Sequence, residues 1–327
     1  MPEARPVPAN LDTLDTHLSA ARDLPTGLAG ILSAIALAGK AIAEKVRRAR
    51  IEDVLGDVGG VNVFGESQQK LDVLADEILR HCLARTPAVA VLASEEAEAA
   101  IPVRSAEEGG RYCVCFDPLD GSSNVDVAVS VGTIFGVIPL ADGLDPTASL
   151  LQPGVRQVAA GYVLYGSSVL LVMAIGSGVD LFVLDPALGD FVHVGEKLRI
   201  PQEKKIYSLN EGYFEDLPAP YQRYLEGAHR SGYSGRYIGS MVADVHRTLL
   251  KGGVFLYPPT QKNPEGKLRL LYEANPMAFV IERAGGLAAA GTGRILEVEP
   301  RDIHQRIPVL LGSPVEVERV TRELERA

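Results

Sequence analysis

The stretch from Val125 to Val194 constrains the fold most, because it is rich in Val, Ile and Gly and is interrupted by turn dipeptides. Asp185-Pro186 and Gly189-Asp190 are two of these turns. β-Branched residues between such turns are typical of strands. The stretch therefore predicts a sheet of several strands.

Helical and strand-like patterns precede the sheet. Apolar residues recur at helical spacing from Leu28 to Val46, and a second helical pattern runs from about Gln68 to Arg85. Two short apolar runs, Ala88 to Ala93 and Arg111 to Phe116, predict strands that each end in a polar, acidic segment. This alternation indicates an α/β protein.

The pattern changes after about Pro201, where shorter elements alternate. The last helix is predicted to begin with Ser313 as its cap, Pro314 at the first helical position and Glu316 closing a capping box. We therefore expect two halves, 1–200 and 201–327. The other elements expected in the second half are strands Lys205 to Leu209 and Val254 to Tyr257, and helices Tyr221 to His229, Met241 to Leu250 and Asn275 to Arg283.

Composition and charge exclude several classes of protein. The formal net charge is −10, whereas a nucleic-acid binder usually presents a basic face. The one dense basic run, 45–50, falls where a helix is predicted to end, and cations favour that position. No apolar run reaches the ~18 residues of a membrane span, and residues 1–11 lack the apolar core of a secretory signal. With only three cysteines, we expect a reduced, cytoplasmic protein.

The segment from Cys113 to Asn124 is the most informative for function. An apolar strand is followed by Asp117 and Asp120, with Pro118 and Gly121 to shape a tight turn. The two carboxylates can then face one point, while free N–H groups and the next two serines face an anion bound there. Such hard oxygen ligands suit Mg²⁺ or Mn²⁺. Taken alone, the same residues also suit an ordinary surface turn.

Other acids favour the metal-site interpretation. Glu95 and Glu96 follow a strand, Glu273 adjoins an apolar stretch, and Asp72 lies on the second helix. Each of them alone is better explained as a solvated surface acid, but together they suggest a cluster.

Histidine and cysteine offer no alternative site at this level. The pair His229 and His246 lacks the short spacing of zinc ligands. Cys113 and Cys115 lie on one face of a strand with no partner pair, so we expect them to pack in the core.

The segment from Asp117 to Asn124 resembles the metal-binding signature of the lithium-sensitive phosphatase superfamily. From about Gly27 to Pro314, the chain is similar to class I fructose-1,6-bisphosphatases. The supporting motifs, in order, are Lys70-Leu71-Asp72-Val73-Leu74, Ser94-Glu95-Glu96, Ser208-Leu209-Asn210-Glu211-Gly212-Tyr213, Arg236 to Arg247, and Gly266 to Glu273. The resemblance implies the sugar-phosphatase fold, a layered α/β sandwich whose halves each have a mixed sheet flanked by helices.

The resemblance also implies a reaction and its residues. The reaction is Mg²⁺-dependent hydrolysis of the 1-phosphate of fructose 1,6-bisphosphate, of the gluconeogenic or Calvin-cycle type, with two or three ions per subunit. Mn²⁺ is an expected substitute. The implied metal ligands are Glu95, Asp117, the Leu119 carbonyl, Asp120 and Glu273. The implied catalytic residues are Glu96, Asp72 and Glu66, an acid in the loop before the second helix where relatives often carry Asp. The implied substrate-binding residues are Asp120, Gly121, Ser122, Ser123, Asn210, Tyr213, Arg236, Tyr237, Tyr257 and Lys267.

Partners and regulation follow from the same resemblance. Arg236 matches an arginine that the family donates to a neighbouring subunit, so a homo-oligomer, a dimer of dimers, is expected. The AMP site of animal members has a Glu-Leu-Thr run where this chain has Gly27-Leu28-Ala29, and an arginine where it has Pro139. We therefore expect weak AMP inhibition.

Other functions remain open at this level. A preference for sedoheptulose 1,7-bisphosphate, or shared use of both sugars, is the nearest alternative. A non-catalytic phosphosugar sensor would be expected to lack a metal carboxylate, and every matched ligand is present. We expect a small-molecule substrate and neither a nucleic acid nor a membrane as partner.

Overall fold

The computed structural model describes residues 12–326 apart from 22, 62–66 and 196. The first helical pattern of the sequence becomes a long helix whose apolar face is fully buried, and the second becomes a shorter one beside it. The helices are α1 (Leu14–Ala20), α2 (Leu28–Arg48), α3 (Lys70–Ala84), α4 (Ala219–Arg230), α5 (Met241–Lys251), α6 (Asn275–Arg283) and α7 (Pro314–Glu325).

The larger sheet is formed by the first half of the chain. Its strands are antiparallel to their neighbours except for one parallel pair. In spatial order they are β10 (Asp190–Gly195), β9 (Gly178–Asp185), β8 (Val169–Ile175), β7 (Ala159–Tyr165), β6 (Val131–Pro139), β5 (Tyr112–Asp120), β3 (Val89–Ser94) and β4 (Ile101–Pro102), with β3 and β5 parallel.

The smaller sheet is formed by the second half and is also mixed. Its spatial order is β12 (Ser234–Gly235), β11 (Ile206–Ser208), β13 (Val254–Tyr257), β18 (Val309–Gly312), β15 (Leu287–Ala290) and β16 (Gly293–Arg294). Two further pairs lie outside these sheets, β1 (Asp57–Val61) with β2 (Ser67–Gln69) and β14 (Leu268–Arg269) with β17 (Arg306–Ile307).

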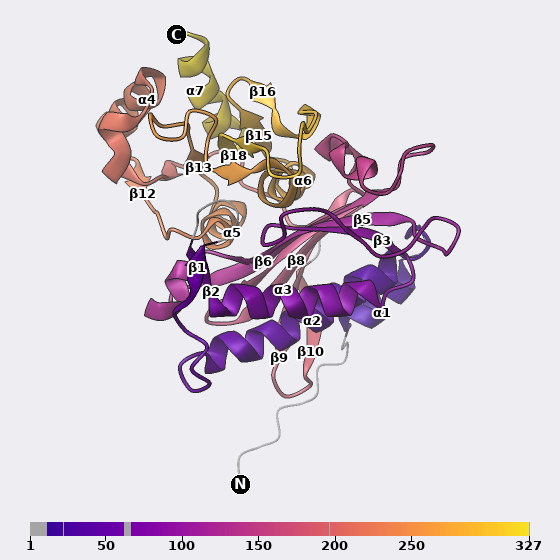
Figure 1. The fold of residues 1–327 in the computed structure, drawn as a ribbon. Coiled ribbons are helices and arrows are strands. Elements are labelled where there is room, and N and C mark those ends of the chain that lie inside the picture. Colours follow the sequence, from indigo (N-terminus) through magenta and orange to yellow (C-terminus); the bar gives the residue numbers. More distant parts are fainter. Residues whose placement is uncertain (1–11, 22, 62–66, 196, 327) are drawn as a thin grey trace.

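The elements stack in five alternating layers (Figure 1). Helices α1, α2 and α3 cover one face of the larger sheet, and α5 and α6 lie between the two sheets. The outer layer, α4 and α7, covers the far face of the smaller sheet. The expected layered α/β sandwich with two mixed sheets is confirmed. Within the described ranges, no helix is long and apolar enough to cross a membrane.

The sheet of several strands predicted for Val125 to Val194 is confirmed by β6 to β10, and 3₁₀ turns occur in the connections before β6 and before β7. Ser122–Val127 forms a 3₁₀ turn, η1, and two more 3₁₀ turns lie between residues 148 and 156. Small polar residues and Pro153 favour such turns over a strand. Cys113 and Cys115 are free and buried, as expected for core residues.

The capping box predicted for the last helix is wrong. α7 begins at Pro314 after Ser313, but the Ser313 side chain makes no capping hydrogen bond. Its hydroxyl donates to the carbonyl oxygen of Pro201 (2.6 Å) and accepts from the N–H of Gly253 (3.1 Å). An unpaired backbone group costs more free energy when it is buried than at a solvated helix end, where water can bind it. The Ser313 hydroxyl therefore pairs with the buried groups.

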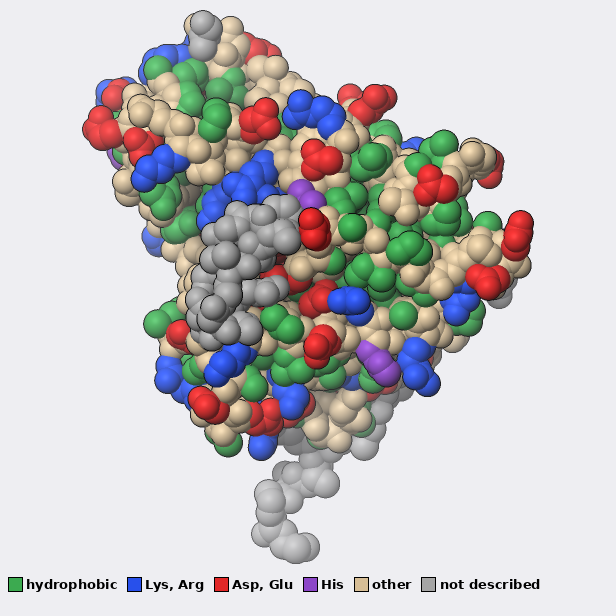
Figure 2. Space-filling model, in the orientation of Figure 1, with side chains coloured by type: hydrophobic (Ala, Val, Ile, Leu, Met, Phe, Trp, Pro, Cys, Tyr) green, Lys and Arg blue, Asp and Glu red, His purple; other side chains and the backbone are tan. Residues whose placement is uncertain are grey.

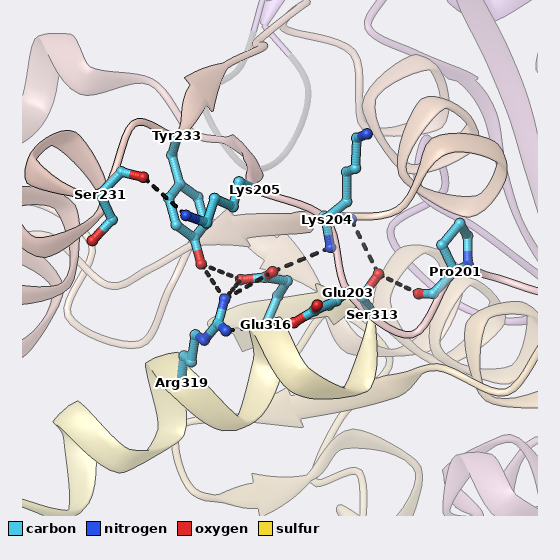
Figure 3. Close-up of polar contacts among 10 residues, drawn as sticks. Pro201, Glu203, Lys204, Lys205, Ser231, Tyr233, Ser313, Glu316 and Arg319 are labelled. Atoms are coloured by element: carbon cyan, nitrogen blue, oxygen red, sulfur yellow. Dashed lines mark hydrogen bonds and ion pairs between the residues drawn. The ribbon is translucent and has the colours of Figure 1, made fainter.

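Glu316 likewise serves tertiary structure instead of the helix end (Figure 3). It is fully buried and accepts from the N–H of Lys204 (3.2 Å) and the hydroxyl of Tyr233 (2.7 Å). Arg319, one turn later on α7, lies 3.1 Å from it and compensates its charge. The network fastens α7 to the segments before β11 and β12.

Candidate active site

Two neighbouring parallel strands deliver acidic side chains to one edge of the larger sheet. In β3 and β5, Ser94 lies opposite Phe116, and the N–H of Glu95 donates to the carbonyl oxygen of Phe116 (3.1 Å). Parallel strands present their carboxyl ends at the same edge. Glu95 and Glu96, which follow β3, therefore lie beside Asp117 in the last part of β5.

Asp117, Asp120 and Glu273 form the core of this acidic cluster. One oxygen from each carboxylate lies within 4.8 Å of the other two, and the residues are only 3%, 8% and 6% exposed. Glu273 comes from a π-helical turn, η5 (Leu270–Ala274), that packs against β5. Asp117 accepts from the N–H of Leu119 (2.9 Å), at a shift in the pairing register of β5 with β6 between Asp117 and Asp120.

The cluster is electrostatically costly without a cation. Burial, followed by the charges of Glu95, Asp120 and Glu273, raises the pKa of Asp117 well above its usual range. Burial also raises the pKa of Asp120. Divalent ions would remove this repulsion, and a buried, all-oxygen donor set fits Mg²⁺ or Mn²⁺ better than a softer metal.

Asp72 lies beside the cluster in the first turn of α3. One of its oxygens accepts from the N–H of Gln69 (3.1 Å), and the other has no hydrogen-bond partner in the described part of the chain. Burial and, next, the charge of Glu96 raise the pKa of Asp72 to about 7. A carboxylate with such a pKa is suited to exchange protons near neutral pH.

The turn after β5 joins the two halves of the molecule. Ser240, the cap of α5, donates to Asp120 (2.7 Å), and the N–H of Val242 donates to the same oxygen (2.9 Å). Gly121 has φ 74°, and a Cβ there would lie 2.7 Å from the Cβ of Ser240. Only glycine fits this close approach, which leaves Ser122 and Ser123 lining the space beside the acids.

The second half of the chain also supplies cationic and phenolic side chains to the cleft. The cleft has a volume of about 360 Å³, and Tyr237, Tyr257, Lys267 and Arg269 line it together with the acids. In Figure 2, basic side chains lie along the upper side of the hollow at the centre of that face, and acidic ones lie within and below it. A cleft that combines acids, which can hold metal ions, with cations and phenols suits a ligand with two anionic groups.

Three predicted substrate residues lie beside the cleft and not among the residues that line it. Asn210 and Tyr213 line a small adjacent hollow that shares Tyr257 with the cleft. Arg236 is exposed and donates to the carbonyl oxygen of Gly235 (2.7 Å).

Asp244 is a functional candidate that sequence reasoning did not single out. It is buried on α5 and accepts from the Ser208 hydroxyl (2.7 Å) and the N–H groups of Ile238 and Gly239 (3.0 Å each). These bonds fix the segment that carries Tyr237. An acid in the first turn of an amphipathic helix looks solvated in sequence, so only its place in the motif could have indicated this role.

Most of the predicted site residues meet in one place. Glu66 lies outside the described residues. The predicted residues that line the cleft are Asp72, Glu95, Glu96, Asp117, Leu119, Asp120, Gly121, Ser122, Ser123, Tyr237, Tyr257, Lys267 and Glu273.

Two family models match nearly the whole chain. The model described as fructose-1-6-bisphosphatase, N-terminal domain, matches residues 14–196, and that described as the C-terminal domain matches residues 200–325.

Curated relatives and solved structures agree with these models. Fructose-1,6-bisphosphatase isozyme 2 of Bos taurus is 50% identical over 297 residues, 89% of this chain and 87% of the relative. Cytosolic fructose-1,6-bisphosphatase of Solanum tuberosum is 49% identical over 298 residues, with the same coverage. The crystal structure of Leishmania major fructose-1,6-bisphosphatase in holo form is 40% identical, with a TM-score of 0.93 over 97% of this chain and 100% of that chain. The apo form gives a TM-score of 0.87 and 38% identity over the same shares.

Proposed function

Since the chain belongs to the fructose-1,6-bisphosphatase family and is a phosphatase of fructose bisphosphate, we propose that it removes the 1-phosphate at the acidic cluster and holds the 6-phosphate with cations and phenols of the second half. The observation that carries this assignment is the buried triplet Asp117, Asp120 and Glu273 in one cleft with cations and phenols. A substrate with two phosphates matches this combination, because one phosphate can bind through metal ions and the other directly to cations and phenols.

The acids would hold two or three Mg²⁺ ions. The proposed ligands are the carboxylates of Glu95, Asp117, Asp120 and Glu273 and the carbonyl oxygen of Leu119. Asp120 can bind an ion while it accepts from α5, because a carboxylate offers about four lone-pair sites. When bound, the ions would neutralise the phosphate charge, which is the main requirement for hydrolysis of a phosphate monoester.

The protein's own groups would position the reactants. Ser122, Ser123 and the N–H groups of the Gly121 turn would bind the oxygens of the transferred phosphate. Glu96 and Asp72 would accept the proton of the attacking water as its oxygen bonds to phosphorus and the bond to the C1 oxygen breaks. Both line the cleft beside the triplet.

The second phosphate and the sugar would bind to side chains of the second half. We assign this role to Asn210, Tyr213, Tyr237, Tyr257 and Lys267. Arg236 is exposed and would serve the site of a partner subunit, so that pairs in a dimer of dimers complete each other's sites. We further propose that the enzyme acts in the cytoplasm, as the name of the Solanum tuberosum relative states for that protein.

A phosphate-release assay tests the assignment. With Mg²⁺ present, fructose 1,6-bisphosphate should be hydrolysed, and fructose 6-phosphate should be the sugar product. Sedoheptulose 1,7-bisphosphate and inositol monophosphate should be run in parallel to define the substrate range. Release of the 6-phosphate, or full activity in excess chelator, would contradict the proposed site.

A further inference from the structure

Two histidines and two aspartates form a closed ring at the edge of the larger sheet far from the cleft. His17 comes from α1, His193 from β10, Asp180 from β9, and Asp12 precedes α1. The Nδ1 atoms of both histidines face one oxygen of Asp12, at 3.4 Å and 3.5 Å. Their Nε2 atoms face the two oxygens of Asp180, at 3.6 Å and 3.3 Å. Strands β8, β7 and β6 separate this ring from β5 and the acidic cluster.

The contacts of Asp12 with the two histidines have the spacing of ligands around one metal ion. Charge-assisted N–H···O bonds have N···O distances of about 2.7–2.9 Å, and the two Asp12 contacts, at 3.4 Å and 3.5 Å, are longer. In a tetrahedral zinc site with bonds of about 2.0–2.1 Å, neighbouring ligand atoms lie about 3.4 Å apart. The contacts of Asp12 with His17 and His193 have this length, and one ligand atom from each of the three residues lies within 4.8 Å of the other two.

We propose that this ring is a zinc site, or a site for a similar transition-metal dication. The ligands are Nδ1 of His17, Nδ1 of His193 and an oxygen of Asp12, with water in the fourth position. Asp180 forms a hydrogen bond with Nε2 of His193 (3.3 Å) and lies 3.6 Å from Nε2 of His17, where outer carboxylates orient histidine ligands in zinc sites. The histidine side chains are 26% and 13% exposed, so an ion can enter from solvent.

The backbone around the ring holds the ligands in place without a metal. Thr13 forms an antiparallel bridge to Val192, and the N–H of His193 donates to the carbonyl oxygen of Asp12 (2.8 Å). The ring of Phe182 packs edge-on against His17. A bound ion would therefore fasten the segment before α1 to β10, the outermost strand of the sheet.

Sequence spacing could not have revealed this site. The sequence analysis looked for histidines at the short spacing of common zinc sites and found none. It did not address ligands that lie far apart in sequence. His17 and His193 lie in different elements that only the folded sheet brings together.

Cobalt(II) distinguishes this site from the acidic cluster. An all-oxygen, octahedral Co²⁺ site absorbs weakly in the visible, whereas a tetrahedral site with histidine ligands absorbs strongly. The metal-free full-length protein is titrated with Co²⁺, and Zn²⁺ is then added as a competitor. We expect a tetrahedral spectrum that saturates at one equivalent and is removed by Zn²⁺.

Variants identify the residues that bind the cobalt ion responsible for the spectrum. His17→Ala and His193→Ala should each abolish it, whereas His81→Ala, which removes an exposed histidine on α3, should leave it unchanged. Asp180→Asn keeps all three ligands and should retain the spectrum with affinity weakened about 10- to 100-fold. Absence of the tetrahedral spectrum in the wild-type protein would overturn the proposal without any variant. Its persistence in both His17→Ala and His193→Ala would do the same.

Discussion

The substitution Asp72→Asn should stabilise the metal-free protein while it impairs catalysis. Asp72 is 5% exposed, and one of its oxygens has no hydrogen-bond partner among the described residues. Its pKa is raised to about 7, mainly by burial and then by Glu96. An acid whose pKa is higher in the folded state destabilises the fold once it ionises. The cost is absent below about pH 4, grows between about pH 4 and pH 7, and is complete above pH 7.

The size of the stability change follows from the shift in the pKa of Asp72. A rise from about 4 to about 7 corresponds to about 4 kcal/mol of lost folding free energy above pH 7. The new amide places an N–H₂ group where the unpartnered oxygen lies, and an unsatisfied buried donor costs about 1–3 kcal/mol. The net gain at pH 8 should therefore be about 1–3 kcal/mol, which raises Tm by about 2–4 °C in a chain of this size.

Thermal unfolding in chelator at pH 4.5 and pH 8 measures the effect. Asp72→Asn should raise Tm at pH 8 and give no increase at pH 4.5. Glu77→Gln makes the same change of charge at an exposed position on α3 and should be near neutral at both values. With excess Mg²⁺ the advantage should shrink, because bound cations favour the ionised Asp72. An equal change in Tm at both pH values, or a fall at pH 8, would show that ionisation of Asp72 does not destabilise the folded state.

Further predictions concern the cleft and its regulation. Asp120→Asn should lower kcat by two or more orders of magnitude in Mg²⁺-dependent phosphate release, because charge stabilisation in the transition state is lost; near-normal turnover would contradict the metal site. Gly121→Ala should cost about 1–3 kcal/mol of stability in denaturant unfolding, because its Cβ meets Ser240 at 2.7 Å. Arg236→Ala should raise KM more than it lowers kcat, with Arg230→Ala as control, and full activity of a monomer would refute the shared site. AMP should inhibit weakly in an activity titration, because Gly27, Ala29 and Pro139 replace the acid, the hydroxyl and the arginine expected to bind it; strong inhibition at micromolar AMP would contradict this.

Sequence reasoning located the elements of the fold and the acids of the site for different reasons. The helices follow from apolar spacing, because burial of one face is a local pattern that tertiary context reinforces, as in α2. The sequence analysis grouped Glu95 with Asp117 because both acids follow apolar strands, and the parallel pairing of β3 with β5 places those strand ends at one edge of the sheet. Such inferences succeed when the partners lie in neighbouring elements.

Prediction from local sequence patterns fails where a polar side chain can bind either a nearby partner or one that is distant in sequence. Ser313 and Glu316 have the spacing of a capping box, yet both bind groups that lie far away in sequence, and Asp244 looks solvated yet organises a loop. Local spacing states which hydrogen bonds are available but not which buried groups would otherwise remain unpaired. Both the acidic cluster and the histidine ring draw on elements that meet only in the folded chain. Buried polar residues whose partners lie far away in sequence therefore mark structural or functional features that local sequence patterns do not predict.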